Sequence, residues 1–409
     1  MNNVPATVIA AIAEARERHD DPLAMFIYDL PALCRHVSKM MSVLPDGVEL
    51  HYAIKANSEA PVLRTLAPWV DGFEVSSGGE IERLDNSGIR KPFIFSGPGK
   101  LDSDLRRALD HEECTVHVES LKEITRLARI AEEAGRIQPV FIRINPQLPP
   151  QITSRLAMAG TATPFGIDET DLADAVRLVD SASHLLLKGF HVHAMSHQQS
   201  TRRHQELMTF YLQCWPHWRA LSENPQHITH LNVGGGIGVN YSGHEQFDWA
   251  GFCATLKMLL SDCNDRPVLR FEPGRFVSAF CGYYVIEVLD QKISHGKGFL
   301  VCRGGTHQFR LPVAQGHDHP VIHLPQQPVH DTIPQYWTVV GQLCTPKDIL
   351  SRDRLLHGVK PGDILVLPLA GAYGYNISHA DFLCHPRPEI IFVADETLSD
   401  ETESSCTCV

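Results

Sequence analysis

Short apolar runs alternate with amphipathic segments from about residue 30 to residue 275. The runs are HYAIK, GFEVSS, PFIFSG, CTVHVES, PVFIRIN, LKGFHVHAMS, THLNVGGG and PVLRFEPG. Between several of them, as in residues 120–135 and 168–182, apolar positions recur at helical spacing. Eight strand-like runs separated by helical segments predict an α/β fold, a (β/α)8 barrel.

The pattern changes after residue 275. GYYVIEVLDQKIS, GFLVCRGG, QYWTVVGQLC and GDILVLPLAGAYG are strand-like, are separated by turns and show little helical periodicity. LAMFIYDL, residues 23–30, precedes the barrel and is suited to the same sheet. We therefore expect a barrel over residues 28–275 and a C-terminal mostly β domain from residues 1–27 and 276–409, completed by an N-terminal strand. The acidic, Ser/Thr-rich tail 396–409 is predicted to be disordered.

Composition narrows the class of protein. A chain of 409 residues is too long for one compact core, which favours two domains. A net charge of −12 argues against nucleic acid or an anionic membrane as the main partner. The sequence has no apolar stretch of membrane-spanning length, and MNNVPATVIA lacks the pattern of a signal peptide. The 11 cysteines include no C-x-x-C pair, so we expect free thiols and a cytoplasmic protein.

A lysine, Lys55, stands where the strand-like segment ending in HYAIK should leave the sheet. Such an ammonium extends to water, pairs with a carboxylate or is occupied covalently, for example as a Schiff base. Glu74, Arg143, His193 and Glu272 also fall at predicted strand ends. Because chemistry in barrels lies at the carboxyl ends of the strands, this coincidence predicts an active site there.

Two glycine-containing segments suit an anionic cofactor. VGGGIG (233–238) leaves backbone amides uncovered, so a phosphate can approach them, although a tight turn would also require glycine. FEPGRF (271–276) places Glu272 at a strand end, where it can accept a hydrogen bond from a protonated ring nitrogen, and Gly274-Arg275 beyond it. The alternative for this second segment is a surface pair between Glu272 and Arg275.

The segment GFHVHAMSH places His191 and His193 on one side of a strand. An H-x-H strand also begins some zinc sites of barrel hydrolases, but the later strand ends here carry glycines and Glu-Pro-Gly instead of further ligands. A histidine stacked on a flat aromatic cofactor fits those neighbours better, and for His191 the alternative is a hydrogen-bonded packing residue.

Two loops of the predicted β domain carry further candidates. GQLCTPKD places Cys344 beside Lys347, and a nearby cation favours a thiol that can exchange protons. With 11 cysteines in the chain, an inert thiol is the alternative. AGAYGYN offers the hydroxyl of Tyr373 from a tight loop, or simply an exposed ring in a turn.

Five segments together resemble the fold type III pyridoxal-phosphate decarboxylases: YAIKAN, HAMS, NVGGGIG, EPGR and GAYG. This family includes ornithine, arginine and diaminopimelate decarboxylases, with alanine racemase as a more distant relative. The segments follow the family's order over nearly the whole chain. The resemblance implies a barrel, a C-terminal β domain, pyridoxal 5'-phosphate as cofactor, and a head-to-tail homodimer whose active sites are shared between subunits.

The same resemblance implies roles for residues at matching positions. Lys55 corresponds to the Schiff-base lysine, Glu272 to the partner of the pyridine nitrogen and His193 to the histidine that stacks on the ring. Glu74 corresponds to a pocket acid and Arg143 to an arginine near the cofactor. The remaining cofactor-binding positions, most of them for the phosphate, are Ser196, Gly235, Gly236, Gly274, Arg275 and Tyr373.

Departures from diaminopimelate decarboxylases bear on the substrate. Those enzymes carry CESGD where this chain has CTPKD. The change keeps Cys344 and Asp348 but places Lys347 at a glycine position. The resemblance implies that all three residues face the substrate. A lysine there suits a distal carboxylate better than the ammonium of ornithine. VGQLCTPKD, GAYGYNISHADFL and CRGGTHQFRLPV most closely resemble the citryl-diaminopropionate decarboxylases of staphyloferrin B siderophore biosynthesis. The resemblance implies a substrate in which citrate is amide-linked to 2,3-diaminopropionate.

The expected reaction is loss of the α-carboxylate, with Cys344 of the other subunit returning a proton to the α-carbon and His193 or Lys55 as alternative donors. Four other functions remain open. A diaminopimelate or ornithine decarboxylase would differ only in substrate, and a racemase would release no carbon dioxide. A cofactor-binding regulator would turn nothing over, and a metal-dependent hydrolase would bind zinc.

Overall fold

The computed structural model describes residues 4–149, 159–243, 245–329 and 333–394. The chain forms two compact units. The barrel unit comprises His36–Val239 and Gln246–Val277, and the β unit comprises Met1–Arg35, Asn240–Glu245 and Ser278–Val409. The sequence predicts that the barrel runs from residue 28 to residue 275. In the structure the units divide after Arg35 and after Val277, and the short segment Asn240–Glu245 belongs to the β unit. The predicted disordered tail lies outside the described residues.

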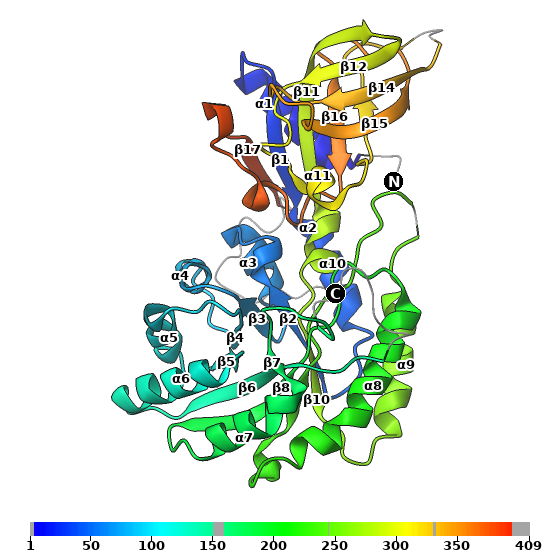
Figure 1. Cartoon of the computed structure of the whole chain (residues 1–409). Helices are drawn as coiled ribbons and strands as arrows, with labels where there is room; N and C mark the ends of the chain where they lie inside the picture. Colours follow the sequence, from blue (N-terminus) through cyan, green and yellow to red (C-terminus); the bar gives the residue numbers. More distant parts are fainter. Residues whose placement is uncertain (1–3, 150–158, 244, 330–332, 395–409) are drawn as a thin grey trace. The chain divides into compact units, whose positions relative to one another are not determined.

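In the barrel unit, eight parallel strands form a closed ring in the order β5, β4, β3, β2, β10, β9, β8 and β6, because β5 also pairs with β6 (Figure 1). The strands are β2 (Val48–Ala53), β3 (Gly72–Val75), β4 (Phe93–Phe95), β5 (Cys114–Val118), β6 (Gln138–Asn145), β8 (Leu185–His191), β9 (His230–Asn232) and β10 (Val268–Phe271). A short strand, β7 (Ile167–Asp168), pairs with β6 alone. Each of the eight runs identified in the sequence contributes one strand of the ring, so the predicted barrel is confirmed.

Helices lie around the outside of this ring (Figure 1). They are α3 (Ala60–Leu66), α4 (Gly78–Asn86), α5 (Asp102–Leu109), α6 (Leu121–Glu133), α7 (Leu172–Asp180), α8 (Thr201–Arg219) and α9 (Trp249–Ser261). In α6 the hydroxyl of Ser120 caps the first turn by accepting from Glu123 N, and Ile124 and Leu127 lie on the buried face. None of the described helices combines the length and the apolar character that crossing a bilayer requires.

The β unit is built on one mostly antiparallel sheet with the path β13, β16, β11, β12, β14, β15. Its strands are β1 (Ala24–Asp29), β11 (Gly282–Ser294), β12 (Lys297–Cys302), β13 (Ile322–Leu324), β14 (Gln335–Val340), β15 (Ile349–Leu356), β16 (Ile364–Pro368) and β17 (Glu389–Val393). β1 pairs with β11 and with β17, so segments from opposite ends of the chain lie side by side (Figure 1). The predicted contribution of an N-terminal strand to this sheet is therefore confirmed.

Four further α-helices belong to the described chain, and α1 packs on the sheet of the β unit. They are α1 (Ala6–Arg18), α2 (Leu30–Met41), which leads from one unit into the other, α10 (Arg275–Ser278) and α11 (Leu311–Gln315). Val8 and Ile12 of α1 are buried in one cluster with Val285 and Val366 of the sheet. Burial of such side chains contributes about 1.5–3 kcal/mol each, so α1 is an integral part of the β unit.

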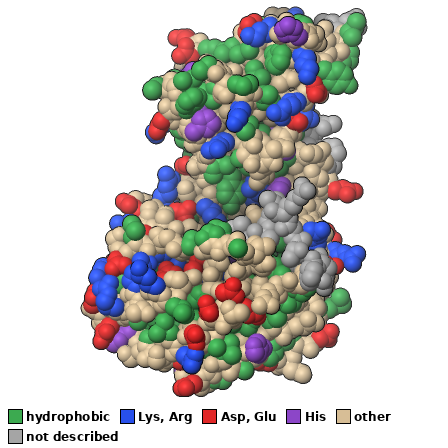
Figure 2. All heavy atoms as spheres, viewed as in Figure 1, with side chains coloured by type: hydrophobic (Ala, Val, Ile, Leu, Met, Phe, Trp, Pro, Cys, Tyr) green, Lys and Arg blue, Asp and Glu red, His purple; other side chains and the backbone are tan. Residues whose placement is uncertain are grey.

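Basic and acidic side chains lie interspersed on the face of the barrel unit seen in Figure 2. Ion pairs on the surface of this unit include Arg106 with Glu133 at 2.7 Å and Arg129 with Asp102 at 2.8 Å. Exposed pairs of this kind contribute about 0–1 kcal/mol each. The stability of the unit therefore depends mainly on its buried strands and helix faces.

Candidate active site

Lys55 lies in a single 3-10 turn, Ile54–Ala56, directly after β2. Its Nζ donates a hydrogen bond of 2.7 Å to Oε2 of Glu74, and its side chain remains 45% exposed while that of Glu74 is fully buried. Gly274, after β10, packs against the same turn, because a Cβ there would lie 2.9 Å from Cβ of Ala56. The lysine is thus paired with a carboxylate and held at a strand end, with part of its side chain open to solvent.

Glu74 is ionised although it is buried. Both oxygens are engaged, since Ser76 Oγ donates to Oε1 at 2.8 Å, Ser96 Oγ donates to the same oxygen, and Lys55 binds Oε2. Burial alone would raise the pKa of Glu74, but the charge of Lys55 and these hydrogen bonds outweigh it and lower the pKa. Glu74 is therefore a fixed anion that holds the lysine in place.

Glu272 follows β10 and is only 7% exposed. Its Oε1 accepts a hydrogen bond of 2.7 Å from Nδ2 of Asn232. Burial, reinforced by the charge of Glu74, raises the pKa of Glu272 to about 7. Because Glu272 is buried, the alternative of a surface pair with Arg275 is wrong. A carboxyl group that titrates near neutrality can share a proton with a pyridine nitrogen.

The glycine run brings three strand ends together. Gly234 and Gly236 have φ angles of +69° and +79°, and a Cβ on any of the three glycines would lie within 2.2 Å of His193, Glu272 or Met195. All three positions therefore require glycine for close packing, in addition to any phosphate contact. The N–H of Gly235 donates to Nδ1 of His193 at 3.2 Å.

His193 is neutral in this setting. Burial, followed by the charges of Arg143 and Lys55, lowers its pKa to about 3. Since Nδ1 accepts from Gly235, the proton of the neutral ring is on Nε2. A neutral, buried imidazole with a fixed orientation suits contact with a flat aromatic ring.

The loops after β8 and β9 run next to each other and carry the predicted phosphate-binding residues. Gln198 N donates to Gly236 O at 2.8 Å, and Cα of Ser196 lies 3.7 Å from the position of a Cβ on Gly236. Arg275 is the first residue of α10. Burial of His197, together with the charge of Arg275, lowers the pKa of that histidine to about 4. The next helix of eight or more residues, α9, begins only at Trp249, so no such helix directly follows the glycine run.

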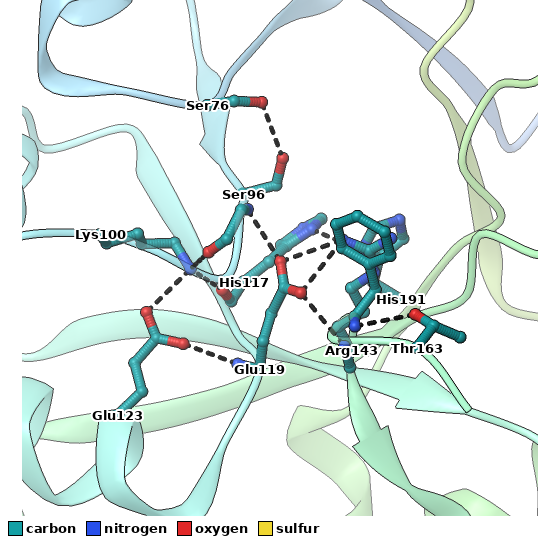
Figure 3. Close-up of polar contacts among 12 residues, drawn as sticks. Ser76, Ser96, Lys100, His117, Glu119, Glu123, Arg143, Thr163 and His191 are labelled. Atoms are coloured by element: carbon teal, nitrogen blue, oxygen red, sulfur yellow. Dashed lines mark hydrogen bonds and ion pairs between the residues drawn. The ribbon is translucent and has the colours of Figure 1, made fainter. Parts of the chain in front are cut away.

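Arg143 on β6 is tied to Glu119, a residue that the sequence analysis missed. Its Nη1 lies 3.0 and 3.1 Å from the two carboxylate oxygens (Figure 3). Its guanidinium lies over the ring of Phe165. Glu119 also accepts from the backbone of Gly97 and Gly166. The signal was the glutamate next to the end of the strand-like run CTVHVES. Arg143 is thus a fixed charge that influences His193 and Glu272.

Among the described residues, His117, His191 and Glu272 offer ligand atoms that lie within 4.8 Å of one another. A cation between them would face the charges of Arg270, Lys100 and Arg143, which already act on His117. This positive surrounding opposes a metal ion.

The other predicted residues belong to the β unit. Cys344 and Lys347 are exposed between β14 and β15, and Tyr373 is half-buried after β16 with a φ of +52°. Asp348 is 2% exposed, and its oxygens accept from Thr306 N at 2.7 Å, Thr306 Oγ1 at 2.8 Å and Leu343 N at 2.8 Å. Asp348 therefore fixes the loop that carries Cys344 and Lys347.

The barrel residues fit pyridoxal phosphate by their chemistry. A partly exposed lysine amine can bond its aldehyde, and a buried carboxyl with a raised pKa can share the ring-nitrogen proton. Glycines after β9, a serine after β8 and an arginine after β10 offer donors suited to a phosphate. No feature of this set requires a metal.

Comparison with known proteins agrees with this chemistry. Residues 30–279 match the family described as pyridoxal-dependent decarboxylase, pyridoxal binding domain. The chain is 39% identical over 403 residues, which cover 96% of it and 100% of the relative, to 2-[(L-alanin-3-ylcarbamoyl)methyl]-2-hydroxybutanedioate decarboxylase of Staphylococcus aureus. It is 30% identical to diaminopimelate decarboxylase of Vibrio cholerae over 93% of this chain and 89% of that one.

Solved structures give the same result for the fold. The structure of diaminopimelate decarboxylase from Helicobacter pylori, complexed with L-lysine, matches with a TM-score of 0.84 and 25% identity over 94% of both chains. A family match over more than half of the chain, an enzyme-like cluster at the barrel's strand ends and relatives aligned over nearly the whole length lead to one assignment. The chain belongs to the pyridoxal-dependent decarboxylases, the carboxy-lyases that use pyridoxal 5'-phosphate.

Proposed function

We propose that this enzyme removes the α-carboxylate of an amino acid that is amide-linked to citrate. This conjugate would be an intermediate in the synthesis of a siderophore of the staphyloferrin B type. The observation that carries the proposal is the 39% identity over the full length of the S. aureus relative, whose name describes a citrate skeleton joined through an amide to carbon 3 of alanine. The match to the V. cholerae diaminopimelate decarboxylase is weaker, at 30% identity. Exposed Lys347 beside Cys344 offers a cation for a distal carboxylate.

Each of the barrel residues would have a separate role in this reaction. The bound cofactor supplies the electron sink for the carbon that loses its carboxylate. Lys55 would hold the cofactor covalently, with Glu74 keeping the amine at the strand end. Glu272, as a carboxylate, would accept a hydrogen bond from the protonated ring nitrogen, and His193 would lie against the ring.

The remaining residues would bind the cofactor's phosphate or return a proton to the substrate's α-carbon. We expect Ser196, Gly236, Arg275 and Tyr373 to bind the phosphate, with Gly274 allowing close approach of the loop. Gly235 already donates its N–H to His193, so it would contribute mainly by packing. Cys344 of a second copy of the chain would deliver a proton to the α-carbon.

The substrate is tested by measuring carbon dioxide release from the citrate–diaminopropionate conjugate, meso-diaminopimelate and ornithine. We expect release from the conjugate, and we expect Lys347→Glu to raise KM for it more than it lowers kcat, because the lysine binds a remote group. Lys360→Glu, a lysine at the turn before β16, is the charge control. Release from diaminopimelate or ornithine alone would discard the conjugate but retain the decarboxylase.

The proton donor is tested with Cys344→Ala. General acid–base catalysis typically contributes about 10²–10⁴-fold, so we expect product formation to slow by about that factor while cofactor affinity stays unchanged. Cys384→Ala, the other exposed cysteine among the described residues, is the matched control. An unchanged rate in Cys344→Ala would remove the thiol from the mechanism.

The homodimer is a second part of the proposal, together with a cytoplasmic location. If sites are shared, Lys55→Ala and Cys344→Ala subunits should restore activity when unfolded and refolded together, since a mixed dimer contains one intact site. Light scattering gives the mass in parallel. A monomeric enzyme with full activity would contradict shared sites.

A further inference from the structure

Two histidines lie side by side inside the barrel, close to Glu272. His117 on β5 and His191 on β8 approach with their Nδ1 atoms 3.0 Å apart (Figure 3). They are 0% and 2% exposed, and the Nε2 atom of each is buried without a hydrogen-bond partner among the described residues. The proposed reaction leaves both rings unused.

Glu272 is the polar group that these rings face. Nε2 of His191 lies 3.7 Å from Oε2 of Glu272, and Nδ1 of His117 lies 4.0 Å from Oε1. The first distance is slightly longer than a hydrogen bond, so a small rotation of either side chain closes it. Both rings therefore face the carboxyl group, and His191 lies slightly closer to it.

The contact between two neutral imidazoles fixes their tautomers as a pair. A short Nδ1–Nδ1 distance requires that one Nδ1 carries the proton and the other accepts it. If His117 is the donor, His191 carries its proton on Nε2 and presents an N–H to Glu272. If His191 is the donor, its bare Nε2 faces the carboxyl group, and that arrangement is stable only when Glu272 is protonated.

The other end of the pair decides between these arrangements. In the first, Nε2 of His117 is a buried acceptor without a partner, and in the second it is a buried N–H without a partner. Orphaned N–H groups are the rarer and costlier case in proteins. The pair therefore favours the arrangement in which His191 donates and Glu272 is ionised.

The surroundings keep both imidazoles neutral. Burial is the main cause, and neighbouring cations add to it, so that the pKa values of both rings are well below the usual value. The charged and titratable groups that act on the three residues are Arg270, Lys100, Arg143, His51, His193, Lys55 and Glu74. Lys100 is itself fixed by Glu123 Oε1 at 2.8 Å and by the carbonyl of His117 at 2.6 Å.

We propose that His191, oriented by His117, is a positioning residue that presents an N–H to Glu272 and keeps it a carboxylate, so that the cofactor's ring nitrogen keeps its proton. The inference rests on the proposed role of Glu272. It extends to residues that lie outside the cofactor-contacting set. A pair that only filled space would leave the titration of Glu272 unchanged.

The first test needs neither cofactor nor substrate. In the cofactor-free protein at pH 8, nitrogen-15 NMR of labelled histidine should show His117 protonated on Nδ1 and His191 protonated on Nε2. Signals are assigned with His117→Gln and His191→Gln. The opposite tautomers would overturn the proposal, whatever the substrate of the enzyme is.

The second test titrates Glu272 by carbon-13 labelling of glutamate carboxyls, with Glu272→Gln for assignment. His191→Leu removes the donor and should raise the proton affinity of Glu272 about tenfold or more, the effect expected of one hydrogen bond to a charged group. His191→Gln keeps an N–H and should stay close to the wild type. His51→Leu, a buried histidine near the other end of the barrel, is the matched control.

The same variants separate the proposal from the choice of substrate. With cofactor bound, His191→Leu should move the pH dependence of the visible absorbance in the same direction, and His191→Gln should restore it. A midpoint in His191→Leu equal to that of His51→Leu would overturn the proposal. Should His191→Leu fail to fold, the wild-type tautomers decide alone.

Discussion

The two ends of strand β2 carry ionisable clusters with opposite character. Near its start, Glu49 lies opposite Arg270 of β10 in the sheet register, with Oε2 at 2.7 Å from Nε of the arginine. His51 and His230 lie 3.5 and 3.7 Å from the same carboxylate. Just beyond its end, Lys55 pairs with Glu74. Among the described residues, no lysine or arginine lies within ion-pair distance of Glu272, and only the neutral His117 and His191 come that close.

Similar residues thus have opposite electrostatic outcomes. Burial opposes ionisation of Glu49, but hydrogen bonds from His230 and His51 and the charge of Arg270 lower its pKa well below the usual value. Burial and the charge of Glu74 raise the pKa of Glu272 to about 7. The balanced cluster is suited to stability, whereas the unbalanced one contains a carboxyl group that exchanges a proton near neutral pH.

The largest effect that this comparison predicts is in Lys55→Ala. Loss of the residue that bonds the cofactor should reduce turnover by several orders of magnitude, as removal of a covalent group does in other enzymes. Lys55→Arg is the matched variant, because it keeps the positive charge beside Glu74 but cannot form the bond. Carbon dioxide assays and borohydride reduction of the bound cofactor measure both effects. Near-normal turnover in either variant would contradict the assignment of Lys55.

The second prediction concerns Glu272→Gln, which should slow turnover by about 10²–10³-fold, as loss of one preorganised electrostatic contact does. Its stability effect has a defined sign. The folded pKa is about 7, above the unfolded value of about 4.3, so ionisation of Glu272 weakens the folded state as the pH rises through this window.

The cofactor-free Gln variant should therefore exceed the wild type in stability at pH 8 and match it near pH 4.5. Urea unfolding at the two values measures this difference. Asn232→Ala is the control, since it removes a hydrogen bond to the carboxylate and should shift stability in the opposite direction at pH 8. Equal stabilities of the Gln variant and the wild type at pH 8 would show that the ionised form of Glu272 does not destabilise the folded protein.

The hydrophobic pattern predicted the eight barrel strands because each is a buried run flanked by helical periodicity. It missed β13, β15 and β17, which are short or mixed in polarity and depend on neighbours in the sheet. For the site, a polar residue at a buried strand's end was a sufficient signal for Lys55 and Glu272. The partners of such residues were not predictable, because Glu119 meets Arg143, 24 positions away, only when β5 and β6 pair.

The third prediction addresses the balanced end. Glu49→Gln leaves Arg270, whose side chain is 11% exposed, without its anion. Removing one partner of a buried pair costs about 3–5 kcal/mol, and the partial exposure of Glu49 reduces this to about 2 kcal/mol. We expect this loss of unfolding free energy in urea, with turnover per folded enzyme unchanged. Arg219→Gln, which breaks an exposed pair with Asp265, should cost less than about 1 kcal/mol.

The smallest effect at neutral pH concerns His51, which shows how the balanced end responds to acid. Burial, with the charge of Arg270, lowers the pKa of His51 to about 4 although Glu49 opposes the shift. The unfolded chain therefore takes up a proton between about pH 6.5 and 4 that the folded protein does not, and stability falls as the pH falls through this window. His51→Gln should reduce the slope of unfolding free energy by about 1.4 kcal/mol per pH unit there and leave it unchanged above pH 7.5. Since His193 and His204 are also buried with lowered pKa values, most of the acid sensitivity should remain in this variant. Urea unfolding from pH 4.5 to 8 measures the slope, and an unaltered slope would mean that His51 takes up its proton over the same pH range in the folded protein as in the unfolded chain.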